Sequence, residues 1–480
     1  MSPGYPVTSM TSTDSARDSV AASRSDSVGS SSPDSVGSSS PDSVGSSGTD
    51  SRSGARHPDA PGPATDSRRF YPQLEGMRAL AAIGVLTTHV AFQTSAVEIP
   101  VLGPVLGRLD LAVALFFGLS GFLLWRPWVD AAHRGAGHPP VRRYLRHRVV
   151  RIWPAYVVVV ALVLLLLPEA QGADLDVWLA NLTLTQVFVP LTLTAGLTQM
   201  WSLSVEIAFY ALLPLIGLAL LQLRGRRVGA RIPVLLMLGA LSLGWAWVGT
   251  SLPVADGVET KNWVFGHLPW FVAGLILAEI AGVLDTGAAR GRWMTLAMRL
   301  SANRSLMFGL LVVAYGLACT RLAGPTGLGD VTNIEFATKM VLGGLCGYAL
   351  LAPLVCNSGP FRFLTSRVML ALGRWSYGIF IWHIAILAVV FPLFGIVPFN
   401  GNTVLVWVIT LGLTVGISAA SYAFIEEPAR HWLRNRETRR RNRAAGDSVS
   451  SDSASPGSSA SQPGQNTSQP VISTAINAGN

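Results

Sequence analysis

Two side chains that could do chemistry lie within one apolar run near the start of the sequence. Arg78 and His89 are separated by ten residues in MRALAAIGVLTTHV, and most of the residues between them are aliphatic. If the run forms a helix, the two side chains lie about 16 Å apart along its axis. Ionisable groups inside a membrane span are costly and often functional, which makes His89 a candidate catalytic residue. The alternative is that His89 only forms a hydrogen bond with a neighbouring helix.

A pair of arginines offers a second kind of chemistry. Arg148 and Arg151 are three residues apart in RHRVVRIWP, so they share one face of a helix at the start of an apolar run. Two guanidinium groups in this arrangement can hold phosphate oxygens through paired hydrogen bonds. The alternative is simple anchoring at the membrane surface, which is enough to explain Arg142, Arg143 and Arg146. The phosphate-loop pattern GxxxxGK[ST] is absent from the sequence.

The composition predicts that these residues belong to an all-α integral membrane protein, whose helices hold them in position. Of the 480 residues, 50% are hydrophobic and only 13% are charged, whereas a soluble protein carries about 25% charged residues. The net charge of +9 comes largely from arginines in short loops between apolar runs, which is typical of membrane loops and argues against nucleic-acid binding. Cys319, Cys346 and Cys356 lie in or beside apolar runs, and their number and spacing predict neither a disulfide framework nor a metal site.

The apolar runs predict about ten transmembrane helices, since each has the length needed to cross a bilayer. Lys and Arg concentrate in cytoplasmic loops, so their distribution predicts the orientation. Four alternate loops carry 15 Lys and Arg in total, and the five loops between them carry 3. We therefore expect a multi-pass protein of the plasma (inner) membrane with both termini in the cytoplasm. The predicted spans are 74–94, 109–128, 149–168, 202–222, 232–250, 264–284, 305–321, 335–356, 369–392 and 403–425.

The two ends of the chain differ from the membrane domain, which we predict to cover residues 70–430. Residues 1–69 are rich in Ser, Asp and Gly, repeat the triplet DSV every eight residues, and are predicted to be disordered. No signal peptide is expected before the first span. Residues 431–480 are predicted to be a basic segment followed by disorder from about Gly446.

The predicted topology indicates how deep in the membrane a third candidate residue, Glu206, lies. His89 would lie in the outer half of the first span, and Glu206 would lie about five residues inside the fourth span, in MWSLSVEIAFY. Similar depths allow a carboxylate–imidazole hydrogen bond, which would fix the tautomer of His89 and raise its basicity. The alternative is a carboxylate that reaches back to the membrane surface.

Six motifs, in order along the chain, match those of a known family. The chain resembles membrane acyltransferase family 3, the integral-membrane O-acyltransferases of bacterial surface glycans and secondary metabolites. The segment of Arg78 and His89 matches the opening Arg-x10-His motif, and RVVRIWPAY matches the RxxR motif, although His147 replaces an arginine of the common RRxxR form. Some relatives carry a C-terminal extracytoplasmic SGNH-type domain, which we do not expect here. The other matches are FFGLSGFLL, MWSLSVEIAFY, LGRWSYGIFIWH and FIEEPAR.

The resemblance implies a mechanism that agrees with the residues. Acyl-CoA would be the co-substrate, with no permanently bound cofactor and no metal, and its phosphates would contact Arg148, Arg151 and Arg78. His89 would act as general base or as acyl carrier, with Glu206 orienting it. The acyl group, expected to be acetyl, would pass to a hydroxyl of a glycan, glycolipid or secondary metabolite. The remaining candidate substrate-binding residues are Ser120, Trp201, Ser202, Ser376, Tyr377 and His383.

Each of these remaining residues has a second interpretation. Ser120, beside Gly121, could line the acyl path or only allow close helix packing. Trp201 could position the acceptor together with Ser202, or only anchor a helix at the interface. Ser376 and His383 share a helix face two turns apart, too far for a nucleophile–base pair, and are expected with Tyr377 to line a pore. Glu427 and Pro428 close the last span and are expected to be structural.

Two other functions fit parts of the pattern. A transporter or flippase for a lipid-linked or glycosylated small molecule would also bury polar residues among ten spans. Against it, the two halves of the chain show no obvious internal repeat. A structural or receptor protein would leave the arginine pair and His89 without a role.

Overall fold

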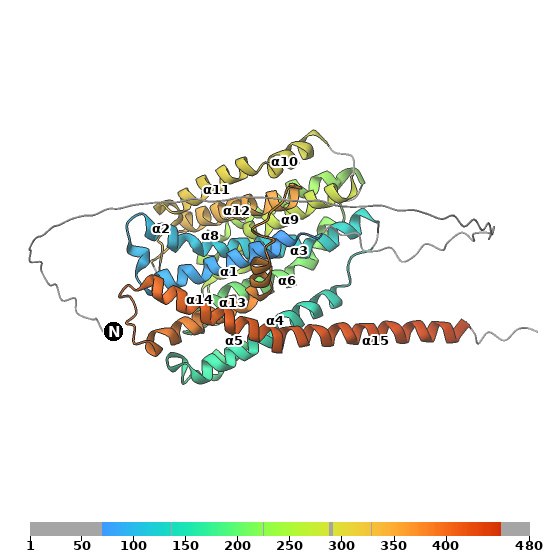
Figure 1. Ribbon diagram of the computed structural model, residues 1–480. Helices are drawn as coiled ribbons and strands as arrows, with labels where there is room; N and C mark the ends of the chain where they lie inside the picture. The colour runs from blue at the N-terminus through green and yellow to red at the C-terminus, as the bar shows by residue number, and fades with distance from the viewer. Residues whose placement is uncertain (1–69, 136, 224, 288–290, 328, 453–480) are drawn as a thin grey trace, which may run out of the picture. The chain divides into compact units, whose positions relative to one another are not determined.

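The computed structural model describes residues 70–452 apart from 136, 224, 288–290 and 328 (Figure 1). Within these residues the regular structure is helical and contains no strand, which confirms the all-α prediction. The predicted disorder of residues 1–69 and 453–480 falls outside the described residues.

A helix overlaps each of the ten predicted spans. These helices are α1 (Pro72–Gln93), α3 (Ala112–His133), α4 (Val141–Leu166), α6 (Trp201–Leu220), α7 (Arg231–Ser242), α9 (Val264–Thr286), α11 (Arg304–Ala318), α12 (Asn333–Cys356), α13 (Arg367–Leu393) and α14 (Thr403–Ser421). The others are α2 (Leu102–Gly107), α5 (Leu175–Thr183), α8 (Trp245–Val248), α10 (Arg292–Ala302) and α15 (Glu427–Asp452).

Length and composition alone identify fewer crossings than the ten predicted. Eight helical segments of the described chain are long and apolar enough to span a bilayer, and α10 with α11, bent by 75°, makes a ninth if the pair is counted as one span. The remaining helix is α1, which has 22 residues. Its sequence contains Glu75, Arg78 and His89, which lower its mean hydropathy.

The packing of α1 shows that it runs alongside the other spans. Near its start, the ring of Tyr71 contacts that of Phe122 on α3, with 5.8 Å between centroids. Farther along, a Cβ added at Gly84 would lie 3.2 Å from the Cβ of Ala112, at the beginning of α3. The two helices are therefore antiparallel over most of their length, so α1 crosses the layer that α3 crosses.

The relative direction of α9 and α12 explains why α10 and α11 together cross the membrane once. A Cβ added at Gly266 would lie 3.1 Å from the ring of Phe336, and further along both helices Trp270 donates a hydrogen bond of 2.8 Å to the Met340 carbonyl. The two helices are therefore parallel. Because parallel spans begin on the same side, the segment between them must cross once, and α10 with α11 makes that crossing.

Helices α3 and α9 approach each other closely in the core. A Cβ added at Gly274 would lie 1.9 Å from the Gly118 carbonyl oxygen, and one added at Gly121 would lie 2.4 Å from the Phe271 carbonyl oxygen. Glycine is needed here because the two backbones approach more closely than any side chain allows.

The C-terminal end of the membrane domain differs from the prediction in two ways. The last span does not close at Glu427 and Pro428 but continues through a π-helical turn, Tyr422–Glu426, into α15. Proline is tolerated in the first turn of a helix, where its missing N–H group has no partner to lose. The prediction of disorder from Gly446 is also wrong as far as Asp452, where α15 ends.

Helix α15 is attached to α4 by one carboxylate. Glu437 accepts hydrogen bonds from Arg143, at 3.1 Å, and from Arg146, and its carboxylate lies 3.1 Å from His147 Nε2. Two of the arginines that the sequence assigned to membrane anchoring therefore also join two helices.

Candidate active site

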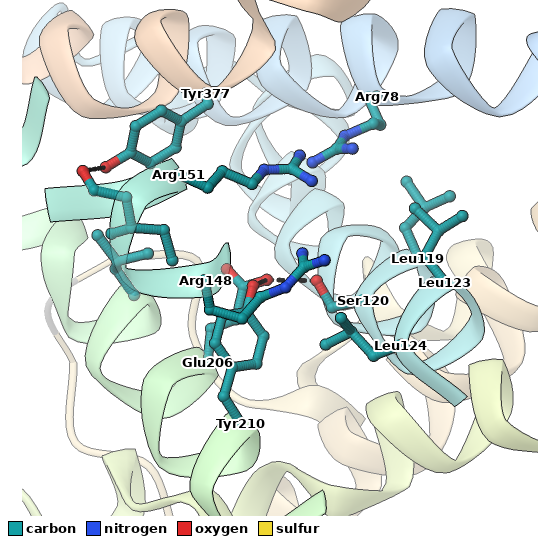
Figure 2. A pocket seen from close by; sticks show the side chains of 12 residues that line it. Arg78, Leu119, Ser120, Leu123, Leu124, Arg148, Arg151, Glu206, Tyr210 and Tyr377 are labelled. Atoms are coloured by element: carbon teal, nitrogen blue, oxygen red, sulfur yellow. Dashed lines mark hydrogen bonds between the residues drawn. The ribbon is translucent and has the colours of Figure 1, made fainter. Parts of the chain in front are cut away.

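Five helices meet around a cavity that contains about 420 Å³ of space, including its open mouth (Figure 2). The three arginines singled out in the sequence all line it, and so do Glu206 and Tyr377. The polar lining residues are Arg78 from α1, Ser120 from α3, Arg148 and Arg151 from α4, Glu206 and Tyr210 from α6, and Tyr377 from α13.

The arginines make this cavity suited to an anion. Figure 2 shows the guanidinium groups of Arg78 and Arg151 facing one another, with that of Arg148 closer to Ser120. The Nε atoms of Arg78 and Arg148 have no hydrogen-bond partner within the described part of the chain. Among the described residues that line the cavity, Glu206 supplies the one carboxylate against three guanidinium groups. An anionic ligand could balance the surplus positive charge and accept the unused N–H groups.

Glu206 has partners other than the predicted one. Its carboxylate accepts a hydrogen bond from Ser120 and a second, of 2.6 Å, from the Tyr210 hydroxyl. The predicted hydrogen bond between Glu206 and His89 is therefore wrong. Equal depth did not bring the two residues together, because Glu206 faces α3 and α4 while His89 faces α13.

The partner that the structure gives His89 is a second histidine. The rings of His89 and His383 lie 5.1 Å apart between centroids, at an interplanar angle of 55°. His383 is only 1% exposed, and its Nδ1 lies 2.7 Å from the Phe380 carbonyl oxygen. His89 is half-buried. Helices α1 and α13 run in parallel, since Glu75 packs against Gly373 near their starts, and so they bring the two imidazoles together.

A second cavity, with about 450 Å³ of space including its open mouth, extends from Arg78 toward the region of the histidines. It shares Arg78, Ser120 and Glu206 with the first cavity and extends to Phe380, whose ring contacts that of His383 at 5.9 Å between centroids. Ser376 and Ser202 also line it. Ser376 is 1% exposed, and its hydroxyl has no partner in the described structure.

Two of the alternative interpretations can now be compared with the structure. Ser120 lines both cavities while its neighbour Gly121 makes the close contact with α9, so lining and packing both occur. Trp201 lines neither of these two cavities, and its ring lies 5.1 Å from that of His267 between centroids. Across the described residues, no three His, Cys, Asp or Glu side chains gather as metal ligands would.

A family model described as an acyltransferase domain matches residues 71–423, which is well over half of the chain. The chain belongs to this acyltransferase family. The resemblance inferred from the motifs is thereby confirmed. Every residue of the candidate site lies within the matched segment.

Individual relatives are similar over most of the acyltransferase domain. The O-acetyltransferase OatA of Staphylococcus aureus (strain NCTC 8325 / PS 47) is 24% identical over 386 residues, which cover 76% of this chain and 58% of OatA. Acyltransferase MdmB of Streptomyces mycarofaciens is 28% identical over 66% of this chain and 79% of its own length. The putative peptidoglycan O-acetyltransferase YrhL of Bacillus subtilis (strain 168) is 25% identical, over 76% and 56%. No solved structure matches the chain significantly.

The sequence analysis left one polar residue of this candidate site, Tyr210, unnoticed. Tyr210 lies four residues after Glu206, on the same helix face, and this spacing could have indicated the hydrogen bond between them. Outside the two cavities, the ring of His267 on α9 lies tilted by 45° against that of Trp201, a contact between distant segments that no local pattern indicates.

Proposed function

We propose that the protein is a membrane O-acyltransferase that moves an acyl group, expected to be acetyl, from cytoplasmic acyl-CoA to a hydroxyl group of an acceptor. One observation carries the proposal: a cavity lined by three arginines continues, through lining residues shared with a second cavity, toward the paired imidazoles of His89 and His383. The names of the relatives support O-acyl transfer, since OatA and YrhL are O-acetyltransferases.

The positive charge of the arginine cavity suits the phosphates at the polar end of the donor. Coenzyme A carries its phosphates and its thioester at opposite ends of a flexible arm, and Arg78 and His89 are separated by about 16 Å along one helix. The phosphates bind to Arg78, Arg148 and Arg151, and the arm lies in the second cavity. The unpaired hydroxyl of Ser376 is available to the amide groups of the arm.

The imidazole of His89 supports the chemical step. The hydroxyl oxygen of the acceptor attacks the thioester carbonyl carbon while its proton passes to a ring nitrogen of His89. The C–S bond then breaks, and the proton passes from His89 to the departing thiolate of coenzyme A. An acyl-histidine intermediate is the other route, in which His89 itself attacks the thioester before the acceptor does.

The two substrates approach from opposite faces of the plasma membrane in this proposal. The loop arginines favour cytoplasmic termini, which puts the arginine cavity on the cytoplasmic side, where acyl-CoA is found. The acceptor reaches His89 from the outer side. We expect a glycan, a glycolipid or a secondary metabolite, since one relative bears the name of a putative peptidoglycan O-acetyltransferase.

Reconstitution in lipid vesicles tests the proposal. Purified protein is supplied with [14C]acetyl-CoA and with soluble peptidoglycan fragments, and alkali-labile label is measured in the fragments and in the vesicle lipids. We expect label in the acceptor with wild type and none with His89→Ala or His89→Gln. Movement of fragments across the vesicle membrane without ester formation would indicate a flippase and contradict the proposal.

A further inference from the structure

The tautomer of His383 follows from its surroundings. Its Nδ1 lies 2.7 Å from the Phe380 carbonyl oxygen and 3.2 Å from that of Ile379. A carbonyl oxygen only accepts, so Nδ1 carries a proton and donates it. A second proton on Nε2 would bury a positive charge and an unused donor in an apolar interface. The Nε2 atom therefore carries a lone pair.

That lone pair is available to His89. The Nε2 atom of His383 is buried without a hydrogen-bond partner in the described residues, although a buried acceptor is more stable when it has one. Leu86, one turn before His89 on α1, and Ile379, one turn before His383 on α13, are fully buried members of one apolar cluster. His89 is the ring beside it that can donate, and its terminal torsion is soft enough for the ring to turn.

We propose that His383 is the positioning residue of His89, and that its Nε2 accepts the hydrogen bond from a ring N–H of His89, in the role that the sequence assigned to the Glu206 carboxylate. The proposal rests on the proposed acyl transfer. A chain of contacts runs from the Phe380 carbonyl through Nδ1–H and Nε2 of His383 to an N–H of His89. This leaves the other nitrogen of His89 unprotonated and directed at the substrate. When His89 takes the proton of the acceptor hydroxyl, its N–H bond to His383 becomes charge-assisted and stronger.

His383 does not itself touch substrate in this arrangement. It is 1% exposed, whereas His89 is half-buried and accessible. His383 thus acts through His89, and it does so as a neutral acceptor.

Two amide substitutions separate this role from a purely structural one. In His383→Asn the amide occupies the place of Nδ1 and keeps the bond to the Phe380 carbonyl, but nothing reaches His89. In His383→Gln the amide oxygen reaches the place of Nε2 and can accept from His89. We expect kcat to fall about 10- to 100-fold in the Asn variant and less than about tenfold in the Gln variant. The KM for acetyl-CoA should stay near wild type in both, because the arginines are unchanged.

The kcat values of variants that bind acetyl-CoA normally decide whether His383 has the positioning role. A Gln variant no more active than the Asn variant would refute the positioning role, and so would wild-type kcat in both. Absence of ester formation by wild type would instead refute the proposed function.

A measurement without turnover covers the case of misfolded variants. Solid-state 15N NMR of histidine-labelled wild type, with the His89 signals assigned from His89→Gln, reports the tautomer of His89. One tautomer with a hydrogen-bonded N–H is expected, and a mixture of tautomers in wild type would overturn the inference whether or not transfer occurs.

Discussion

Removing one arginine from the cavity should weaken donor binding by a predictable amount. Arg151 is half-buried, lines the cavity and faces Arg78, whereas Arg142 on the same helix is exposed and does not line it (Figure 2). Loss of a charged hydrogen bond to phosphate costs about 1.5–3 kcal/mol, which corresponds to roughly 10- to 150-fold in affinity. Arg151→Ala also relieves repulsion with Arg78, so we expect the lower half of this range. Arg142→Ala should bind acetyl-CoA like wild type.

Equilibrium binding of acetyl-CoA to the detergent-purified variants measures these affinities, and two controls identify the cause. Acetylpantetheine lacks the phosphates, so it should bind more weakly than acetyl-CoA. Its affinity should be the same for wild type and Arg151→Ala. Arg151→Lys should restore only part of the affinity, because it keeps the charge but not the planar fork. Equal acetyl-CoA affinities in Arg151→Ala and Arg142→Ala would refute the phosphate-binding role of the cavity.

Three further predictions follow from the packing and the topology. Glu206→Gln should lower kcat by less than about tenfold, whereas an orienting carboxylate would cost about 10²-fold or more. Gly274→Ala should destabilise the protein by about 1–3 kcal/mol in chemical unfolding, because its Cβ would overlap the backbone of α3, while Gly316→Ala, which meets nothing within 4 Å, should be neutral. In a cysteine-free background, an impermeant maleimide applied to intact cells should label Gln171→Cys but not Gly137→Cys, and the reverse pattern would invert the topology.

The sequence predicted the elements well because the signals are local. Hydrophobic runs of bilayer length located a helix for each of the ten spans, since a backbone in lipid must satisfy its own hydrogen bonds. The convergence of Arg148 and Arg151 was predictable from their spacing along one helix face. Arg78 joins them because it lies near the start of α1, at the same end of the bundle.

The partner of His89 was not predictable by the same reasoning. Counting residues from the ends of two spans gives their depth but not the direction in which each side chain points. That direction depends on which helices pack together, and the contact of α1 with α13 is set by features such as the absent side chain of Gly373. Depth alone therefore selected Glu206, whereas the packing selects His383.

The predicted end of the last span was wrong for a different reason. Pro428 predicts a helix boundary, but the preceding π-helical turn lets the chain continue into α15. The hydrogen bonds of Glu437 with Arg143 and Arg146 then hold this extension on α4. These contacts join residues far apart in the sequence, which no local pattern can report.

The pairing of α1 with α13 has a consequence for biosynthesis. His89 emerges from the ribosome with the first span, and His383 belongs to the ninth, so most of the domain is synthesised between them. At about 5–20 residues per second, the first histidine waits roughly 15–60 s for its partner. During this interval α1 must remain in the bilayer, with Arg78 and His89 held by spans that are made before α13, such as α3. The proposed catalytic centre therefore forms only near the end of synthesis, and we expect nascent chains that stop before α13 to be inactive.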